Sequence, residues 1–271
     1  MGKFDGCLLY SDIDGTFIND KENIPEQNIS AVKYFMNEGG KFGLATGRAN
    51  HSSRRYVEGA GINVPGIFYN GAMVYDFDMG KTLNLEMPSD ESKKYIDFVF
   101  DIYPDIGIEF VYDNMILACN INDEIRYHFT LEDFIFKETT LDKVRPDWIK
   151  ILFVDTSDVI ADLNDIMSSK NFSDAGFVRS CPYFLEMLPK NASKGNALKW
   201  TANYLGIGMD KTFAIGDFYN DLSMVKNAAL GGFVKNAPED LHSEGDVVLC
   251  SNNDGAVAEF IGEIEKYIAR N

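Results

Sequence analysis

The first constraint on the fold is a short apolar run that ends in two closely spaced carboxylates. Cys7-Leu8-Leu9-Tyr10 is followed directly by Ser11-Asp12-Ile13-Asp14-Gly15-Thr16. An apolar run of this length predicts a buried strand of a parallel sheet. In open α/β sheets the chemistry lies at the carboxyl ends of the strands, which is where Asp12 and Asp14 would stand. Gly15 permits a tight turn at this point.

The same segment is open to two other interpretations. Asp-x-Asp-Gly is a common turn composition, and Thr16 can hydrogen-bond locally to fix such a turn. A calcium-binding EF-hand loop would need Gly at its sixth position and a bidentate Glu at its twelfth. Counted from Asp12, these positions hold Phe17 and Asn23, which excludes that loop. As a site, one carboxylate can attack phosphorus or bind a hard cation while the other transfers a proton.

The length and composition indicate a two-domain globular protein. The 271 residues suffice for two modest hydrophobic cores, and 45% apolar with 25% charged residues is ordinary for this class. No run approaches the ~20 apolar residues of a membrane helix, and the first strand begins too early to follow a signal peptide. The 4 cysteines form no CxxC pair, which indicates reduced thiols. We therefore expect a cytoplasmic protein with no membrane partner.

The chain is strongly acidic. Its 42 acidic and 25 basic residues give a formal net charge of -17. Nucleic acids need a basic face, so we expect no nucleic-acid partner. The same charge repels anionic ligands at long range. A phosphorylated substrate would therefore need a local positive cluster, most simply a metal ion with a Lys or Arg.

Strand and helix patterns alternate along the N-terminal part of the chain. After the first strand, helix, strand, helix and strand are predicted in turn over Pro25–Glu38, Lys41–Thr46, Asn50–Gly61 and Gly66–Tyr69. This order predicts an α/β fold with a doubly wound, Rossmann-like parallel sheet.

The pattern changes in the middle of the chain and then returns. The middle is predicted to be a mixed block of strands and helices. Strands are predicted over Ala72–Tyr75, Thr82–Leu85, Ile108–Tyr112, Met115–Cys119, Trp148–Val154, Ala175–Ser180 and Tyr183–Leu188, and helices over Ser89–Tyr103, Asp123–Leu131 and Ser157–Ser169. The stretch after Leu131 is predicted to be irregular. The first pattern resumes with Ser193–Leu205, Thr212–Ile215, a helix through Met224, Leu230–Val234, Val247–Leu249 and a last helix from Asp254-Gly255 to about Ala269. We predict a core domain of residues 1–83 and 189–271 and an inserted α+β domain of residues 84–188.

Four separated motifs lie at predicted strand ends or helix starts. They are Ser11-Asp-Ile-Asp-Gly-Thr16, Ala45-Thr-Gly-Arg48, Ser193-Lys194-Gly195 and Gly216-Asp-x-x-Asn-Asp221. In this order they resemble the motifs of the haloacid dehalogenase (HAD) superfamily of phosphotransferases, and most closely its Cof-like branch of cytosolic phosphatases. The resemblance spans the whole chain, including a large α/β cap inserted after the third core strand. It implies that the insert determines substrate specificity.

The resemblance also implies a role for each motif residue. Asp12 is the expected nucleophile, which forms an aspartyl-phosphate, and Asp14 is the expected general acid and base. Mg²⁺ would be bound by Asp12, the backbone carbonyl of Asp14, and Asp217, with Asp221 as an indirect partner. The phosphoryl oxygens would be held by Thr46, Gly47, Lys194 and Asn220.

Several of these residues have a simpler interpretation without the resemblance. Lys194 would be a solvated helix lysine, Thr46 a plain strand-end threonine, and the acidic residues after Gly216 the first turn of a helix. Arg48 is expected in a structural or substrate-side ion pair. Asn70 lies at a strand end and either faces substrate or belongs to an Asn-Gly turn.

The predicted function is Mg²⁺-dependent hydrolysis of small phosphomonoesters such as sugar phosphates or phosphorylated cofactors. One alternative is a phosphosugar mutase of the same superfamily, which would need convergent basic residues, whereas Arg126, Arg145 and Arg179 are widely spaced. The other is a non-catalytic phosphometabolite-binding protein, against which the presence of both Asp12 and Asp14 argues. The expected partner is a small phosphorylated metabolite, and the expected state is a monomer or a weak homodimer.

Overall fold

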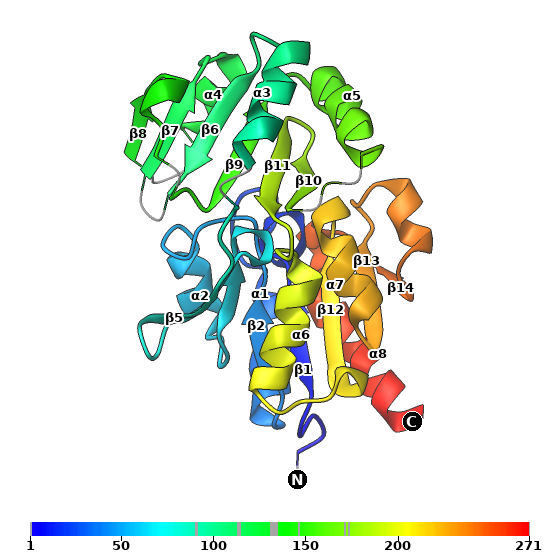
Figure 1. Ribbon diagram of the computed structural model, residues 1–271. Coiled ribbons are helices and arrows are strands. Elements are labelled where there is room, and N and C mark those ends of the chain that lie inside the picture. The colour runs from blue at the N-terminus through cyan, green and yellow to red at the C-terminus, as the bar shows by residue number, and fades with distance from the viewer. Residues whose placement is uncertain are drawn as a thin grey trace. The chain divides into compact units, whose positions relative to one another are not determined.

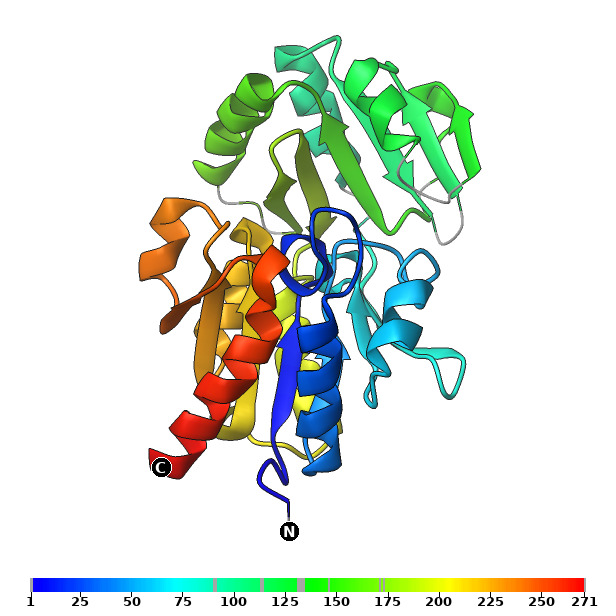
Figure 2. The ribbon, with the colours of Figure 1, turned by 180° about the vertical axis from the view of Figure 1, so that it is seen from behind.

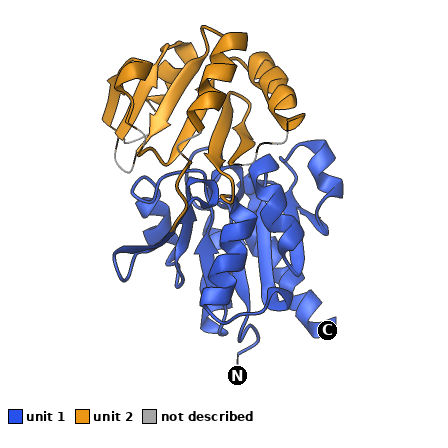
Figure 3. Cartoon of the chain, in the orientation of Figure 1, with its two compact units in different colours: residues 1–84, 193–271 blue, residues 85–192 orange. Residues whose placement is uncertain are grey.

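The chain forms two compact units in its computed structural model. The structure describes residues 2–89, 92–112, 115–130, 135–145, 147–170, 172 and 174–270. Unit 1 comprises Met1–Asn84 and Ser193–Asn271, and unit 2 comprises Leu85–Ala192 (Figure 3). Unit 2 is therefore an insertion within the sequence of unit 1.

A five-stranded parallel sheet lies at the centre of unit 1. Its strand order is β14-β13-β12-β1-β2, with bounds β1 (Leu8–Ser11), β2 (Lys41–Leu44), β12 (Thr212–Gly216), β13 (Leu230–Val234) and β14 (Val247–Leu249). In the register of β1, Ser11 pairs with Ile215 of β12 and with Leu44 of β2. The carboxyl ends of these three central strands therefore lie level with one another.

Helices cover both faces of this sheet, which confirms the predicted doubly wound, Rossmann-like core. On one face lie α6 (Lys194–Tyr204) and α7 (Leu222–Asn227) (Figure 1). On the other, α1 (Glu26–Asn37) and α8 (Ala256–Arg270) lie side by side (Figure 2). Because β1 is covered on both faces, every one of its residues is buried, and it reads in the sequence as an apolar run. Within the described ranges, no helix combines the length and apolar character needed to cross a bilayer.

The third strand departs from the predicted core sheet. β3 (Gly66–Phe68) is joined to the parallel sheet by a single bridge between Ala45 and Ile67. It pairs in antiparallel fashion with β4 (Met73–Asp76), and β5 (Lys81–Leu85) completes a separate three-stranded sheet. The left-handed turn at residues 69–71 causes this change, because it reverses the chain directly after the strand.

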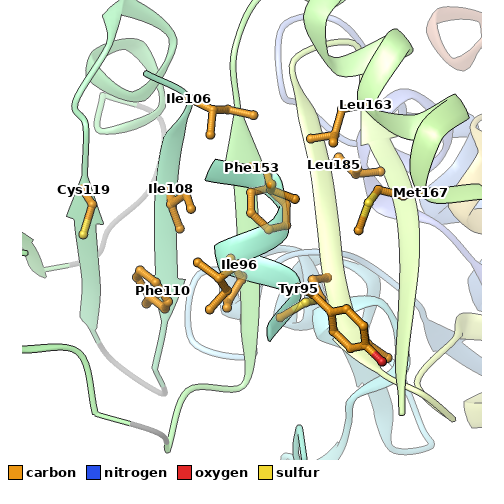
Figure 4. Packing of buried hydrophobic residues seen from close by; sticks show 14 of the residues in the cluster. Tyr95, Ile96, Ile106, Ile108, Phe110, Cys119, Phe153, Leu163, Met167 and Leu185 are labelled. Atoms are coloured by element: carbon orange, nitrogen blue, oxygen red, sulfur yellow. The ribbon is translucent and has the colours of Figure 1, made fainter. Parts of the chain in front are cut away.

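A mixed six-stranded sheet forms unit 2. Its order is β10-β11-β9-β6-β7-β8, with bounds β6 (Gly107–Val111), β7 (Met115–Cys119), β8 (Ile135–Glu138), β9 (Lys150–Val154), β10 (Ala175–Cys181) and β11 (Phe184–Pro189). On one face pack α3 (Lys93–Ile102) and α5 (Ser157–Ser168), and their side chains interlock with those of the strands (Figure 4). Tyr95 and Ile96 come from α3, while Leu163 and Met167 come from α5. This α+β unit has its own hydrophobic core.

Strand β8 contradicts the prediction of an irregular stretch after Leu131. It pairs in parallel with β7, Ile135 lying beside Met115. It is a four-residue edge strand, and Ile135 is 59% exposed, so it lacks the apolar alternation that identifies a longer strand. Unit 2 also contains helix α4 (Asp123–His128), which is capped by the side chain of Asn122.

Helix α2 (Arg54–Ala60) is shorter than the helix predicted from Asn50. The hydroxyls of Ser52 and Ser53 donate hydrogen bonds to the carbonyl of Ala49, at 3.3 and 2.8 Å. These local bonds hold a separate turn before the helix. In unit 2, the predicted helical positions Asp90, Glu91 and Leu131 lie outside the described residues. Short 3-10 turns occur at Tyr69–Gly71, Leu141–Lys143, Met209–Lys211, Tyr219–Asp221, Glu239–Ser243 and Asn252–Asp254.

Candidate active site

The carboxyl ends of the three central strands carry the predicted motifs. Asp12 follows β1, and its backbone N–H donates to the carbonyl of Ile215 at 3.0 Å. Asp217 directly follows β12, and Thr46 stands two residues after β2. Because the register holds these ends level, residues more than 150 positions apart in sequence meet at one edge of the sheet.

Three carboxylates cluster at this edge. Asp12, Asp217 and Asp221 each present an oxygen within 4.8 Å of the others. Thr16 donates to Oδ1 of Asp217 at 3.4 Å, so it ties the first motif to the last one and does not act only within its own turn. Gly15, with φ +70°, allows the approach, since a Cβ there would lie 2.3 Å from Oδ2 of Asp217.

Lys194 is the cation at the centre of this cluster. It is fully buried, and its Nζ donates to Oδ1 of Asp12 at 2.5 Å and to Oδ1 of Asp221 at 2.6 Å. It is the first residue of α6, where the helix dipole disfavours a positive charge, so the two carboxylates must compensate. Lys194 is thus not the solvated helix lysine that the sequence alone would have suggested.

Asp221 fixes the loop that carries Asp217. Its Oδ2 accepts the backbone N–H groups of Asp217 and Phe218 at 3.0 and 3.1 Å, while its Oδ1 accepts from Lys194. Both oxygens of Asp221 are therefore engaged by the protein. Asp12 and Asp217 remain as the carboxylates that could bind a cation directly.

Burial and mutual repulsion perturb the acidic groups. Burial raises the pKa of Asp12 to about 8, with Lys194 opposing the shift and the carboxylates of Asp221 and Asp14 adding to it. Burial and the charges of Asp12 and Asp221 also raise the pKa of Asp217 well above its usual range. Burial would lower the pKa of Lys194, but Asp12 and Asp221 outweigh it and the pKa is raised. The cluster therefore favours an additional positive charge.

A divalent cation fits this donor set. When all three carboxylates are ionised, the cluster and its one ammonium group carry two negative charges, which a divalent cation would neutralise. Asp12 and Asp217 offer oxygen ligands of the kind that Mg²⁺ prefers. The absence of sulfur and imidazole donors among the clustered residues disfavours softer metals.

Asp14 and Arg48 form a bidentate ion pair. Nε and Nη2 of Arg48 each donate to a carboxylate oxygen of Asp14 at 2.7 Å. The Asp14 side chain is 49% exposed, unlike that of buried Asp12. The backbone N–H of Arg48 also donates to Oγ1 of Thr46 at 3.1 Å, so the Thr46 hydroxyl hydrogen can point to a ligand.

Asn220 and Asn70 contact each other. Nδ2 of Asn220 donates to Oδ1 of Asn70 at 2.9 Å. A Cβ on Gly47 would lie 3.1 Å from Nδ2 of Asn70, so this side chain rests against the Thr46-Gly47-Arg48 loop. One of the two amide hydrogens of Asn220 is therefore engaged by Asn70, and the other remains for the phosphoryl oxygen that the resemblance implies.

Sequence reasoning missed Asn236. Its Nδ2 donates to the carbonyl of Gly15 at 2.8 Å, and its Oδ1 accepts the N–H of Asn252 at 3.0 Å, which holds the turn after Asp14 in place. Asn236 follows the end of strand β13, so its position after a predicted strand could have identified it as a site residue.

Comparisons with known proteins place the chain in a family. Residues 9–261 match the model of the haloacid dehalogenase-like hydrolases. A Streptococcus pyogenes protein named "Putative phosphatase" is 29% identical over 262 residues, which cover 94% of this chain and 96% of that protein. The 5-amino-6-(5-phospho-D-ribitylamino)uracil phosphatase YwtE of Bacillus subtilis is 23% identical over 278 residues, covering 93% and 96%.

A solved structure gives the same fold. The HAD subclass IIB sugar phosphatase BT4131 matches with a TM-score of 0.82 and 21% identity, over 95% of this chain and 98% of that one. The family model spans nearly the whole sequence, and the two relatives described above are named as phosphatases. The chain therefore belongs to the haloacid dehalogenase-like hydrolases.

Proposed function

We propose that the protein hydrolyses small phosphomonoesters with Mg²⁺ through an aspartyl-phosphate on Asp12. The observation that carries this proposal is the buried ion triad of Asp12, Lys194 and Asp221 beside Asp217. A nucleophile must be oriented, and the bond from Lys194 holds one oxygen of Asp12. The same cation and a bound Mg²⁺ would neutralise the charge that phosphoryl transfer brings into the site.

Asp12 acts as the nucleophile and Asp14 as the general acid and base. A carboxylate oxygen of Asp12 bonds to phosphorus as the bond from phosphorus to the leaving oxygen breaks, and Asp14 gives that oxygen its proton. Water then attacks phosphorus and gives a proton to Asp14, which releases inorganic phosphate and regenerates Asp12. Asp14 must first leave its ion pair with Arg48, so Arg48 would become available to the substrate at the same time.

Mg²⁺ would supply a positive charge at the phosphoryl oxygens when bound. Asp12, the carbonyl of Asp14, and Asp217 would hold it, with Asp221 behind them to fix the loop. Thr46, Gly47 and Lys194 would bind the phosphoryl oxygens. The position of Lys194 at the start of α6 suits this role, since a helix N-terminus favours anions.

Unit 2 would determine which phosphomonoester is used. It has its own core and is inserted between segments of unit 1, so it can vary without disturbing the acidic cluster. The similar proteins named for sugar phosphates and for 5-amino-6-(5-phospho-D-ribitylamino)uracil suggest a polyhydroxylated metabolite as the substrate class. The cysteines Cys7, Cys119, Cys181 and Cys250 are free thiols, which suits a cytoplasmic enzyme.

The direct test traps the covalent intermediate. Purified protein is mixed with a phosphomonoester and Mg²⁺, quenched in acid, and digested for mass spectrometry, with EDTA-treated protein and Asp12→Asn alongside. We expect phosphate on Asp12 alone, no turnover in EDTA or in Asp12→Asn, and normal turnover in Asp101→Asn, a control at an exposed position of α3. Phosphate on a Ser or His, or full activity after chelation, would overturn the proposal.

A further inference from the structure

The turn after β3 has an unusual backbone. Tyr69, Asn70 and Gly71 have φ angles of +51°, +54° and +95° in succession. Side chains other than glycine rarely adopt this region, and for a bulky residue such as Tyr69 it is a marked outlier. Strain of this kind persists only where the surroundings impose it, and it concentrates at sites that bind ligands.

Two neighbouring segments impose this turn. The N–H groups of Tyr69 and Asn70 donate to the carbonyls of Arg48 and Thr46, both at 3.0 Å, on the two sides of Gly47. A Cβ on Gly71 would lie 2.2 Å from the carbonyl oxygen of Ser193, directly before Lys194. The turn is therefore held between the Thr46-Gly47-Arg48 loop and the start of α6.

The side chain of Asn70 carries an unused donor in this crowded place. Asn70 is 1% exposed, and its Oδ1 accepts from Asn220. Among the residues that the structure describes, no acceptor lies within hydrogen-bonding distance of its Nδ2. A buried amide donor without an acceptor is costly and rare, so this atom is a candidate to donate to a bound ligand.

Asn220 sets the direction of this donor. Because its Nδ2 donates to Oδ1 of Asn70, the amide of Asn70 must place its own Nδ2 on the other side. The amide as a whole rests against Gly47, beside Thr46, since a Cβ on Gly47 would lie 3.1 Å from Nδ2 and 3.2 Å from Oδ1 of Asn70. Asn220 itself precedes Asp221, whose carboxylate binds Lys194, so the amide pair connects three of the four motifs.

We propose that Asn70 donates a hydrogen bond from Nδ2 to a phosphoryl oxygen of the substrate, and that Asn220 is the positioning residue that orients it. The proposal rests on the proposed phosphatase function, because it assumes that the phosphoryl group lies at Thr46 and Gly47. An oxyanion suits the donor, since the hydrogen bond of a neutral amide to a charged acceptor is stronger than one to a neutral group. Binding of the phosphoryl group would also give Nδ2 of Asn70 the acceptor that it lacks.

The test removes the amide and keeps the turn. In Asn70→Gly, glycine adopts the left-handed backbone without strain. The dissociation constants of inorganic phosphate and orthovanadate are measured by calorimetry with Mg²⁺ present. We expect both anions to bind about 10- to 100-fold more weakly, the range of a hydrogen bond to a charged group. Asn120→Gly is the matched control, because Asn120 in unit 2 has nearly the same φ, +51°, and its substitution should leave anion binding unchanged.

Kinetics separate the phosphoryl group from the leaving group. In Asn70→Gly, kcat/KM should fall by one common factor for an aryl phosphate and for a sugar phosphate. A fall with the sugar phosphate alone would mean that Asn70 faces the leaving group and would overturn the proposal. Unchanged anion binding in a well-folded Asn70→Gly would overturn it as well. If Asn70→Gly does not fold, Asn70→Asp keeps the shape and should weaken anion binding further, because it replaces the donor with a negative charge.

A double-mutant cycle tests the role of Asn220. Asn220→Ala should weaken phosphate binding in the wild-type background and much less in the Asn70→Gly background. Equal effects in both backgrounds would remove Asn220 from the proposal. Failure of the proposed phosphatase function would give a different result. If the wild-type protein hydrolyses no phosphomonoester, the phosphatase proposal is refuted. If Asn70→Gly still weakens phosphate binding in that case, the assignment of Asn70 as a donor stands.

Discussion

At the scale of single residues, the site depends on one buried cation. Lys194 is enclosed at the start of α6, and its ammonium group separates Asp12 from Asp221. Removing a partner from a buried ion pair leaves an uncompensated charge in a medium that solvates it poorly. Lys194 is therefore expected to be needed for the fold as well as for the chemistry.

Lys194→Met should lower the free energy of unfolding by about 3–5 kcal/mol, because it leaves buried carboxylates unpaired. Urea unfolding of the metal-free protein measures this. Lys226→Met is the control, because Lys226 pairs with Glu244 at the surface, with 52% of its side chain exposed, and should cost at most about 1 kcal/mol. Equal losses in the two variants would contradict the central role of Lys194.

The pKa of Asp12 predicts how stability changes with pH. Its carboxyl has a pKa of about 8 when folded against an ordinary value of 3.8, so the folded state binds the extra proton between these limits. The unfolding free energy of metal-free wild type relative to Asp12→Asn should therefore fall as pH rises from about 4 to about 8. Mg²⁺ favours the ionised form and should raise the melting temperature more at pH 8 than at pH 5. A flat difference between the two proteins would contradict the shifted pKa.

The sequence predicted which motif residues stand at strand ends but not which of them pair. Asp12, Asp217 and Thr46 follow apolar runs, so their place at the sheet edge could be expected. The pairing of Arg48 with Asp14 and the bond between Asn220 and Asn70 depend on rotamers and on loops from different parts of the chain. Spacing along the sequence does not encode those contacts.

At the scale of elements, the turn at residues 69–71 determines both the fold and the site. It turns the chain back so that β4 pairs with β3, which is why β3 leaves the predicted core sheet. It also rests against the Thr46-Gly47-Arg48 loop and the start of α6. The Asn-Gly pair in the sequence indicated a turn at this place, but its double contact arises only when β2, β3 and α6 pack together.

Gly71→Ala should test this packing. Alanine there meets both a left-handed φ of +95° and the Ser193 carbonyl at 2.2 Å. Gly61→Ala has a similar backbone, φ +64°, but open space around the new methyl group, so it should cost about 1 kcal/mol from the backbone alone. We expect Gly71→Ala to cost a further 1–3 kcal/mol or so in urea unfolding. Equal costs would show that the turn is not pressed against α6.

At the scale of the whole molecule, the chain has two units with separate hydrophobic cores. Unit 1 contains the acidic cluster and all four motifs, and unit 2 has a separate sheet with its own helices. The alternation of strands and helices in the sequence predicted the parallel sheet of unit 1, whereas unit 2 could be predicted only as a mixed block of strands and helices. Its edge strand β8 escaped prediction because short exposed strands lack a clear apolar pattern.

Exchange of unit 2 should change substrate preference but not the basic chemistry. The segment Leu85–Ala192 is replaced by the corresponding segment of a relative with a different preferred substrate. We expect kcat/KM for the natural phosphomonoester to change by a larger factor than kcat/KM for a generic aryl phosphate. If both change by the same factor, unit 2 is not the specificity element.

The pairing of β1 with β12 also bears on how the chain reaches this structure. Leu8 pairs with Thr212, so the central sheet joins segments on either side of the inserted unit. Closing so long a loop in a disordered chain costs entropy and slows folding. The segment Leu85–Ala192 is continuous, so it can form its core as soon as it leaves the ribosome, and its folding shortens the loop that unit 1 must close. The insertion is thus suited to fold first, with unit 1 completed only when synthesis reaches the last strands.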